Sequence, residues 1–184
     1  MGPSGIGKST LLHMLAGIDH PSDGIIQLND ITISHQSFPE RIALLEHKIS
    51  MVFQQPCLIA ELNVLENIML KAIIAQTMTA KLYQHAHDLL NEVGLQGKQD
   101  CYPQTLSGGQ QQKVAILRAI FHPPQFLLAD EPTGNLDQHS AQQVIELLKY
   151  YQKKYAMGLI ISTHDISIAQ QCNKIVKIEN YQLY

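Results

Sequence analysis

The sequence predicts an α/β protein in which a mostly parallel sheet is flanked by helices and a helical lobe is inserted into the chain. Three short apolar runs, at residues 49–53, 126–130 and 158–162, have the composition of strands that are buried on both faces of a sheet. Amphipathic stretches with helical spacing alternate with these runs. A glycine-rich loop directly precedes the first helix, as in sheets that bind anions beside their strand ends.

The composition limits the classes of partner. The chain has 184 residues, of which 45% are hydrophobic, so it can form the core of one domain with a small inserted lobe. The net charge is −3 and no basic block occurs, which argues against nucleic acid as the main partner. There is no apolar run of about 18 residues, so we expect contact with a membrane only through partner chains. The three cysteines have no metal-ligand spacing, and we expect reduced, mostly buried thiols.

The first residues spell a phosphate-binding loop that opens a helix. The segment reads G-x-x-x-x-G-K-S and is followed by the apolar residues 11–16. Glycines let backbone N–H groups point at an anion, and the first helical turn adds unpaired donors and a positive dipole end. We expect Lys8 to reach the β- and γ-phosphates and the Ser9 hydroxyl to bind Mg²⁺. The residues expected to hold the nucleotide here are Gly2, Pro3, Ser4, Gly5, Ile6, Gly7, Lys8, Ser9 and Thr10.

An alternative interpretation of this loop remains open. A glycine-rich turn before an ordinary helix would look similar, although it would need lysine and serine at these spacings by chance. Only Met1 precedes the loop, whereas a phosphate loop is normally fed by a buried strand. We therefore expect the strands before the loop to be missing from the sheet, which leaves an inactive fragment as an alternative to an active enzyme.

The next segments predict a helix end, a hairpin and the first strand. Gly17 is placed to end the first helix, and residues 18–24 are dense in turn formers. Residues 25–33 resemble a short hairpin, and residues 39–48 have helical spacing. The apolar run that follows ends at Gln54, so an amide side chain is expected where a buried strand stops.

A helical lobe and a second anion-binding segment are expected in the middle of the chain. Residues 62–93 have a helical pattern that Gly94 ends, and their apolar stripe is expected to be core or a partner-docking surface. A polar, glycine-rich segment then precedes a helix over residues 111–121 and again offers free N–H groups to an anion, although a capped helix start needs no ligand. This second segment comprises Ser107, Gly108, Gly109 and Gln110.

Two acids and a histidine follow the last two predicted core strands. Asp130 ends one strand, at the edge where parallel sheets bind ligands, and is expected to hold Mg²⁺ opposite Ser9. Glu131 comes next and is expected to orient or deprotonate the attacking water. His164 follows the other strand, where it can hydrogen-bond a γ-phosphate and Glu131. Solvated acids and a structural histidine are the alternatives, and they become improbable beside a phosphate loop.

Helices and a hairpin are expected in the remaining segments. Residues 140–154 and 166–171 have helical patterns, and residues 174–184 resemble a terminal hairpin.

The constellation resembles the ATP-binding subunits of ABC transporters along essentially the whole chain. Six motifs occur in the order of that family, and the sequence LSGGQ is by itself a specific signal. Residues 2–10 resemble Walker A, 53–54 the Q-loop, 106–110 the signature, 127–132 Walker B with the catalytic glutamate, 136–137 the D-loop with Asp137, and 162–165 the H-loop.

The resemblance implies a P-loop NTPase core and a shared catalytic site. The implied core comprises residues 1–56 and 123–184, and the implied helical lobe, residues 57–122, docks on transmembrane permease subunits. Two copies would form a homodimer in which each ATP lies between the phosphate loop of one copy and residues 107–110 of the other. Gln54 would contact Mg²⁺ or the attacking water, Glu131 and His164 would be catalytic, and Asp137 would contact nucleotide. Such subunits are peripheral proteins on the cytoplasmic face of the inner membrane.

The sequence resembles one subgroup of this family and departs from the family pattern before Walker A. Residues 107–120 and 129–137 are most similar to the lipoprotein-releasing ATPases and the macrolide and peptide exporters, and residues 61–68 to the lipoprotein-releasing type. Family members carry an aromatic residue before Walker A that stacks on adenine, and none precedes the loop here. A soluble ABC ATPase without a transport role is a further alternative, although tandem cassettes, a long coiled coil and zinc cysteines are not seen.

Overall fold

A three-stranded parallel sheet lies at the centre of the molecule, as the sequence predicts. The computed structural model describes residues 1–184, apart from the side chain of His35. The strand order is β3 (Ile49–Val52), β4 (Phe126–Asp130) and β5 (Gly158–Ser162). Val52 pairs with Ala129 and Asp130 pairs with Ser162, so the three carboxyl ends meet at one edge. The α/β class and the parallel sheet are thereby confirmed.

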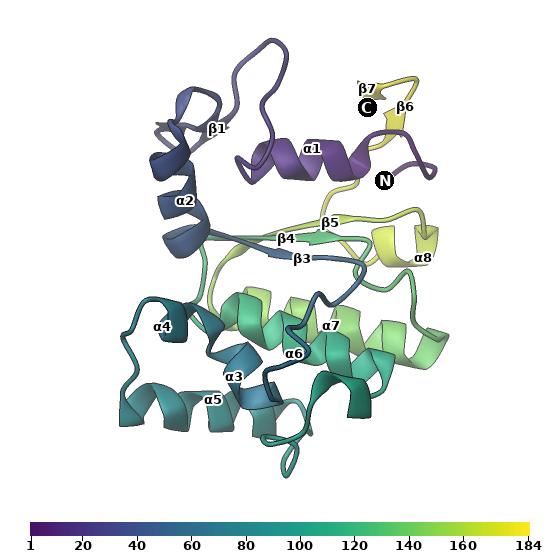
Figure 1. Ribbon diagram of the computed structural model, residues 1–184. Helices are drawn as coiled ribbons and strands as arrows, with labels where there is room; N and C mark the ends of the chain where they lie inside the picture. The colour runs from purple at the N-terminus through teal and green to yellow at the C-terminus, as the bar shows by residue number, and fades with distance from the viewer.

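Helices cover both faces of the sheet (Figure 1). One face carries α1 (Lys8–Leu15), and the other packs on α6 (Gly108–Ile120) and α7 (Gln138–Lys154). The alternation of β4 explains this: Leu127 and Ala129 join the large core on the α6 and α7 side, and Leu128 joins the smaller core under α1. A strand buried on both faces must be apolar throughout, which is why β4 reads as a continuous apolar run.

The predicted helical stretch of residues 62–93 is broken into three helices, α3 (Val64–Ile68), α4 (Leu70–Ile74) and α5 (Ala80–Glu92). Asn63 and Glu66 form a capping box that starts α3. Gln76 adopts a left-handed backbone conformation with φ 53°, and Thr79 caps α5 by accepting a hydrogen bond from the Leu82 N–H. The apolar pattern continues across these breaks, so periodicity alone could not locate them.

The remaining elements are short. Both predicted hairpins are present but shorter than expected, and α6 starts at Gly108 instead of residue 111 because Ser107 caps it. The other elements are β1 (Gln27–Leu28), β2 (Ile31–Thr32), η1 (Ile33–His35), α2 (Phe38–His47), η2 (Pro103–Thr105), α8 (Ile166–Ala169), β6 (Ile178–Glu179) and β7 (Gln182–Leu183).

The helical lobe is tied to α7 by a buried tyrosine. Tyr151 of α7 is fully buried and its hydroxyl donates a 3.1 Å hydrogen bond to Glu92 of α5. The Lys154 ammonium pairs with the same carboxylate at 2.6 Å and lies 5.6 Å from the Tyr151 ring centroid. Burial and the neighbouring Glu92 carboxylate raise the pKa of Tyr151 well above its usual range, so the phenol stays protonated.

An apolar cleft runs along the free side of β5. Its walls come from α1, from β5 and from residues 174–178, and its volume is about 320 Å³. The sheet order places β5 at an edge, and Ile160 in its middle is 40% exposed. At the end of the cleft the Gly2 N–H donates to the Thr163 carbonyl and the Ile178 N–H to the Met1 carbonyl. The first two residues therefore join the end of β5 to the start of β6, which lies near the N-terminus in Figure 1.

Two further findings concern the membrane and the cysteines. None of the helices within the described residues is both long and apolar enough to cross a membrane. The sequence analysis predicted mostly buried thiols, and this prediction is wrong. Cys57 and Cys172 are exposed and Cys101 is half-buried. All three lie in segments outside the helices and strands, and of the three Cys101 packs against the main hydrophobic core.

Candidate functional site

The phosphate loop is shaped by two glycines in conformations that other residues rarely adopt. Gly5 has φ 80° and Gly7, the residue before α1, has φ 97°. Gly2 is also required for space, because a Cβ there would lie 2.9 Å from the carbonyl oxygen of Ile178. The loop thus reaches the first turn of α1, whose unpaired N–H groups and positive dipole end favour an anion.

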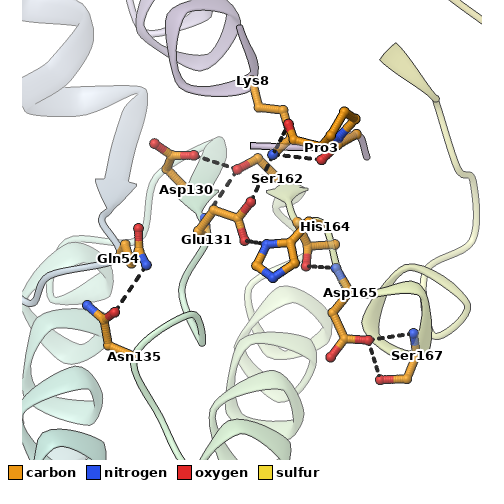
Figure 2. A network of polar contacts seen from close by, with 12 residues as sticks. Pro3, Lys8, Gln54, Asp130, Glu131, Asn135, Ser162, His164, Asp165 and Ser167 are labelled. Carbon is orange, nitrogen blue, oxygen red and sulfur yellow. Dashed lines mark hydrogen bonds and ion pairs between the residues drawn. The ribbon is translucent and has the colours of Figure 1, made fainter. Parts of the chain in front are cut away.

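Lys8 closes the loop on itself. Its ammonium donates hydrogen bonds to the carbonyls of Gly2 at 2.7 Å and Pro3 at 3.0 Å. The same nitrogen lies 3.0 Å from Oε1 of Glu131, and Lys8 is only 7% exposed (Figure 2). Three oxygens therefore compensate the buried charge, and an incoming phosphate must replace some of these contacts to reach Lys8.

Asp130 is held by a serine to which the sequence patterns assigned no role. Oδ1 of Asp130 accepts a hydrogen bond from the Ser162 hydroxyl, across the pairing of β4 with β5. Asp130 is 8% exposed, and within the described residues no hydrogen bond to its Oδ2 is seen. Ser162 also accepts a 3.1 Å hydrogen bond from the Glu131 N–H. One hydroxyl thus orients the two consecutive acids.

Glu131 stands between Lys8 and His164 in a strained backbone conformation (Figure 2). Its φ of 46° lies in the left-handed region, which costs about 1–3 kcal/mol for a residue other than glycine. Oε1 pairs with Lys8 at 3.0 Å, and Oε2 lies 2.9 Å from Nδ1 of His164. The conformation turns the carboxylate out of the β4 direction and toward the phosphate loop. The contact between His164 and Glu131 that the sequence led us to expect is therefore present.

Gln54 lies at the end of β3 and is held by a second residue that the sequence analysis did not identify. Its Nε2 donates a 3.2 Å hydrogen bond to Oδ1 of Asn135, in the connection that follows Glu131. A Cβ at Gly134 would lie 2.6 Å from that same Nε2, so a larger residue there would displace the amide from this position. No local pattern could reveal the contact, because Gln54 and Asn135 are 81 residues apart in the chain.

Lys8, Gln54, Glu131 and His164 converge on one cavity of about 320 Å³ beside the phosphate loop, whereas Asp130 is not among the residues that line it. A volume of this order suits part of a small polar ligand. The lining residues are Ser4, Gly5, Gly7, Lys8, Ser9, Thr10, Gln54, Glu131 and His164.

The second anion-binding segment lies elsewhere and faces solvent. Ser107 caps α6 through a capping box with Gln110, and Ser107 and Gly108 are exposed. The start of α6 packs beside the start of α7, because a Cβ on Gly109 would lie 3.0 Å from the Ser140 hydroxyl. Residues 107–110 do not belong to the cavity that the described residues form at the phosphate loop. One copy of the chain therefore does not bring its two anion-binding segments together.

Asp137 occupies a capping position at the neighbouring helix start. Its carboxylate accepts hydrogen bonds from the Ser140 N–H at 3.0 Å and from the Ser140 hydroxyl at 2.6 Å. These two hydrogen bonds, the hydroxyl first, lower the pKa of Asp137. In this conformation the side chain stabilises α7, and it reaches no nucleotide-binding residue of its own chain.

The residues predicted to hold Mg²⁺ have suitable chemistry. Ser9, Gln54 and Asp130 offer only oxygen ligands, which Mg²⁺ prefers. No group of three or more histidine, cysteine, aspartate or glutamate side chains able to hold a metal occurs within the described residues. Few protein ligands is the ordinary arrangement where Mg²⁺ is shared with substrate phosphates and water, so the donor set fits.

Comparison with known proteins agrees with this geometry. The family model described as "ABC transporter" matches residues 1–134. The lipoprotein-releasing system ATP-binding protein LolD of Legionella pneumophila (strain Lens) is 38% identical over 184 residues, 100% of this chain and 81% of that protein. The macrolide export ATP-binding/permease protein MacB of Rhodopirellula baltica is 37% identical over 182 residues, covering 98% of this chain and 27% of that protein.

A solved structure extends the comparison to the fold. The ATP-binding cassette MJ0796, in a dimeric post-hydrolysis state bound to ADP and Pi, superposes with a TM-score of 0.86. It is 33% identical, and the match covers 100% of this chain and 81% of that chain. The likeness thus includes the sheet, its helical layers and the phosphate loop.

Proposed function

Because this chain belongs to the ABC transporter family and is one of its ATPases, we propose that two copies of it enclose two ATP molecules and hydrolyse them to drive a transporter. The observation that carries the proposal is the separation of the two anion-binding segments. The phosphate loop lines the cavity with Glu131, whereas residues 107–110 face solvent at another helix start. A second copy placed head to tail would bring its Ser107 hydroxyl and its Gly108 N–H group to the nucleotide of the first.

The dimeric state of the similar cassette supports this arrangement. That cassette is described as a dimer bound to ADP and Pi, which are the products of ATP hydrolysis. An exposed capping serine and two glycines at the start of a helix also suit a site completed by a partner, because exposed N–H donors can be covered by a nucleotide without rearrangement.

The chemistry follows from the contacts around Glu131. Water attacks the γ-phosphorus, the bond to the bridging oxygen of ADP breaks, and the proton of the water passes to the Glu131 carboxylate. Lys8 exchanges its contact with Glu131 for the β- and γ-phosphates, which frees the carboxylate to accept the proton. His164 keeps Oε2 of Glu131 in place, and Gln54 reaches the cavity from the opposite side.

Mg²⁺ is the cofactor that this chemistry requires. Bound to Ser9, Asp130 and Gln54, it would neutralise charge on the phosphate oxygens. Ser162 fixes one oxygen of Asp130 and leaves the other for the metal or for a metal-bound water.

The transport task is the finer part of the proposal. We expect residues 57–122 to dock on separate transmembrane permease subunits, which would hold the chain at the cytoplasmic face of the inner membrane. The Legionella relative, matched over the whole chain, supports release of lipoproteins as the exported cargo class. The macrolide exporter relative supports export as the direction of transport.

The test of catalysis is Glu131→Gln in the full chain. Glutamine keeps the shape of the side chain but cannot accept the proton, so hydrolysis should stop while ATP still holds two copies together. Turnover would be followed by phosphate release and dimer formation by light scattering with ATP and Mg²⁺. Unchanged turnover would remove Glu131 from its role, and monomers at saturating ATP would refute the shared site.

The cargo requires a separate test. The chain would be expressed with the membrane proteins encoded beside its gene, and the purified complex would be supplied with an acylated lipoprotein or with a macrolide in lipid vesicles. Lipoprotein should stimulate ATP hydrolysis and be released to its acceptor. Stimulation by the macrolide alone would assign the chain to drug export instead.

A further inference from the structure

We propose that Gln112 and Arg118 of α6 are positioning residues for Gln54. The inference rests on the proposed function, in which Gln54 faces the nucleotide of its own chain. The two side chains hold the backbone on either side of Gln54, so the helix that starts at residues 107–110 also fixes the loop that carries Gln54.

Gln112 holds the residue before Gln54. Its Nε2 donates a 2.9 Å hydrogen bond to the carbonyl of Phe53, and Gln112 is 1% exposed. Its Oε1 is buried and has no hydrogen-bond partner within the described residues. A buried amide with an unsatisfied oxygen is unfavourable for a structural role alone. We therefore assign Gln112 the role of holding the Phe53 carbonyl.

Arg118 holds the residues after Gln54. Its guanidinium donates to the carbonyl of Pro56 at 2.9 Å and to that of Cys57 at 2.7 Å. Cys57 has a left-handed φ of 47°, an unfavourable conformation for a residue with a side chain. The forked guanidinium fits two successive carbonyls, which a lysine ammonium cannot reproduce with the same geometry.

The side chain of Gln54 is oriented separately from its backbone. Asn135 accepts a hydrogen bond from Nε2 of Gln54 (Figure 2). The glycine at position 134 leaves the amide in this place, because a Cβ there would lie 2.6 Å from Nε2. The amide therefore lies between a backbone held by α6 and a side-chain contact to the connection after Glu131. Any shift of α6 relative to β4 must alter the direction in which the amide reaches the cavity.

This link gives α6 two functional ends. Its first residues would contact the ATP bound to the partner copy, and its later turns hold residues 53–57 of its own chain. The helix has 13 residues, and at about 1.5 Å per residue it spans roughly 20 Å. A continuous helix moves as one body along its axis. When the start of α6 contacts the ATP bound to the partner copy, the resulting displacement therefore also moves Gln54, which acts on the ATP bound to its own chain.

The first test is Gln112→Met in the full chain. Methionine has similar length and removes the unsatisfied oxygen, which offsets the lost hydrogen bond to the Phe53 carbonyl, so the melting temperature should change little. We expect kcat for ATP to fall by about three- to tenfold, the size of one lost neutral hydrogen bond, with KM altered less than about twofold. Backbone amides of Phe53, Gln54 and Cys57 should exchange hydrogen faster.

A second test compares two arginines that hold backbone carbonyls in the same way. Arg118→Lys should lower kcat, accelerate exchange at residues 53–57 and reduce the cooperativity of hydrolysis with respect to ATP. Arg41, whose guanidinium donates to the carbonyls of Gly17 at 3.0 Å and Ile18 at 3.4 Å, is the matched control. Arg41→Lys should leave kcat, the cooperativity and the exchange of the Gln54 loop at wild-type values.

The outcomes separate this inference from the proposed function. Wild-type kcat and exchange in Gln112→Met and Arg118→Lys would overturn the inference and leave catalysis by Glu131 intact. A fall in kcat matched by a lower melting temperature, with unchanged exchange at residues 53–57, would also overturn it. If the wild type shows no hydrolysis that depends on Glu131, the proposed function fails, and the exchange measurement still decides the positioning role.

Discussion

Ser162→Ala is expected to weaken Mg²⁺ binding without unfolding the protein. The hydroxyl of Ser162 donates to Oδ1 of Asp130, and it accepts the Glu131 N–H at 3.1 Å. The Glu131 N–H keeps a second acceptor, the Ser162 carbonyl at 3.1 Å, so the loss there is small. The main loss is one hydrogen bond to a carboxylate, worth about 1.5–3 kcal/mol.

Ser162→Ala is expected to lower the affinity for Mg²⁺ more than it lowers the rate of hydrolysis at saturating Mg²⁺. A loss of this size corresponds to roughly a 10- to 100-fold change in metal affinity, the usual consequence of removing a residue that orients a metal ligand. The concentration of free Mg²⁺ that gives half-maximal ATP hydrolysis should rise by that factor. The maximal rate should fall less, because excess Mg²⁺ restores occupancy of the site.

The assay needs a serine that is equally buried but remote from the acids. Ser50 of β3 is 4% exposed, compared with 7% for Ser162, and its hydroxyl accepts a 3.1 Å hydrogen bond from Lys71. Ser50→Ala should leave the Mg²⁺ dependence unchanged and is the matched control. Hydrolysis would be measured across free Mg²⁺ at saturating ATP, beside thermal melting of both variants. Equal half-saturation in the two variants would refute the orientation of Asp130 by Ser162.

Three further outcomes are expected. Lys8→Ala should weaken ATP binding at least about tenfold, the loss of one charge-assisted contact, as measured by equilibrium dialysis; wild-type affinity would count against the phosphate loop. Hydrogen bonds from Ser140 lower the pKa of Asp137 below its ordinary 3.8, so its stabilisation is complete above that pH and is lost as the pH falls through the folded pKa. The loss of unfolding free energy in Asp137→Asn, measured by chemical denaturation, should thus be the same across neutral pH and become smaller in strong acid. A loss that stays the same in strong acid would contradict this. Tyr151→Phe should cost about 1.5–3 kcal/mol of unfolding free energy, because the hydrogen bond to the Glu92 carboxylate is lost; no change would show that the bond contributes nothing.

Much of the sheet could be predicted because each of its strands is a short apolar run between helical segments. The run at residues 158–162 coincides with β5 in its bounds. The expectation that this strand is buried is wrong, because β5 lies at the edge of the sheet and Ile160 is 40% exposed. The helical lobe was predicted less well, because Gln76 breaks the helix through a backbone conformation that no residue pattern indicates. The start of α6 was placed three residues late because glycines in a first turn look like loop residues.

The site shows the same division between local and distant determinants. The phosphate loop is contiguous in sequence, so its chemistry could be predicted from spacing alone. The roles of Ser162 and Asn135 arise from strand pairing and from a contact across 81 residues, and neither leaves a local signal. The ion pair of Lys8 with Glu131 was also not predicted, because sequence reasoning assigned the two groups to phosphate and to water.

The cleft beside β5 leaves one edge of the sheet uncovered in the single chain. The free edge of β5 faces the apolar cleft, and an uncovered strand edge of this kind can form hydrogen bonds with another polypeptide strand. Any molecule that occupies the cleft in the folded form alone shifts the folding equilibrium by mass action. A rise in melting temperature when a peptide is added would therefore report occupancy of the cleft.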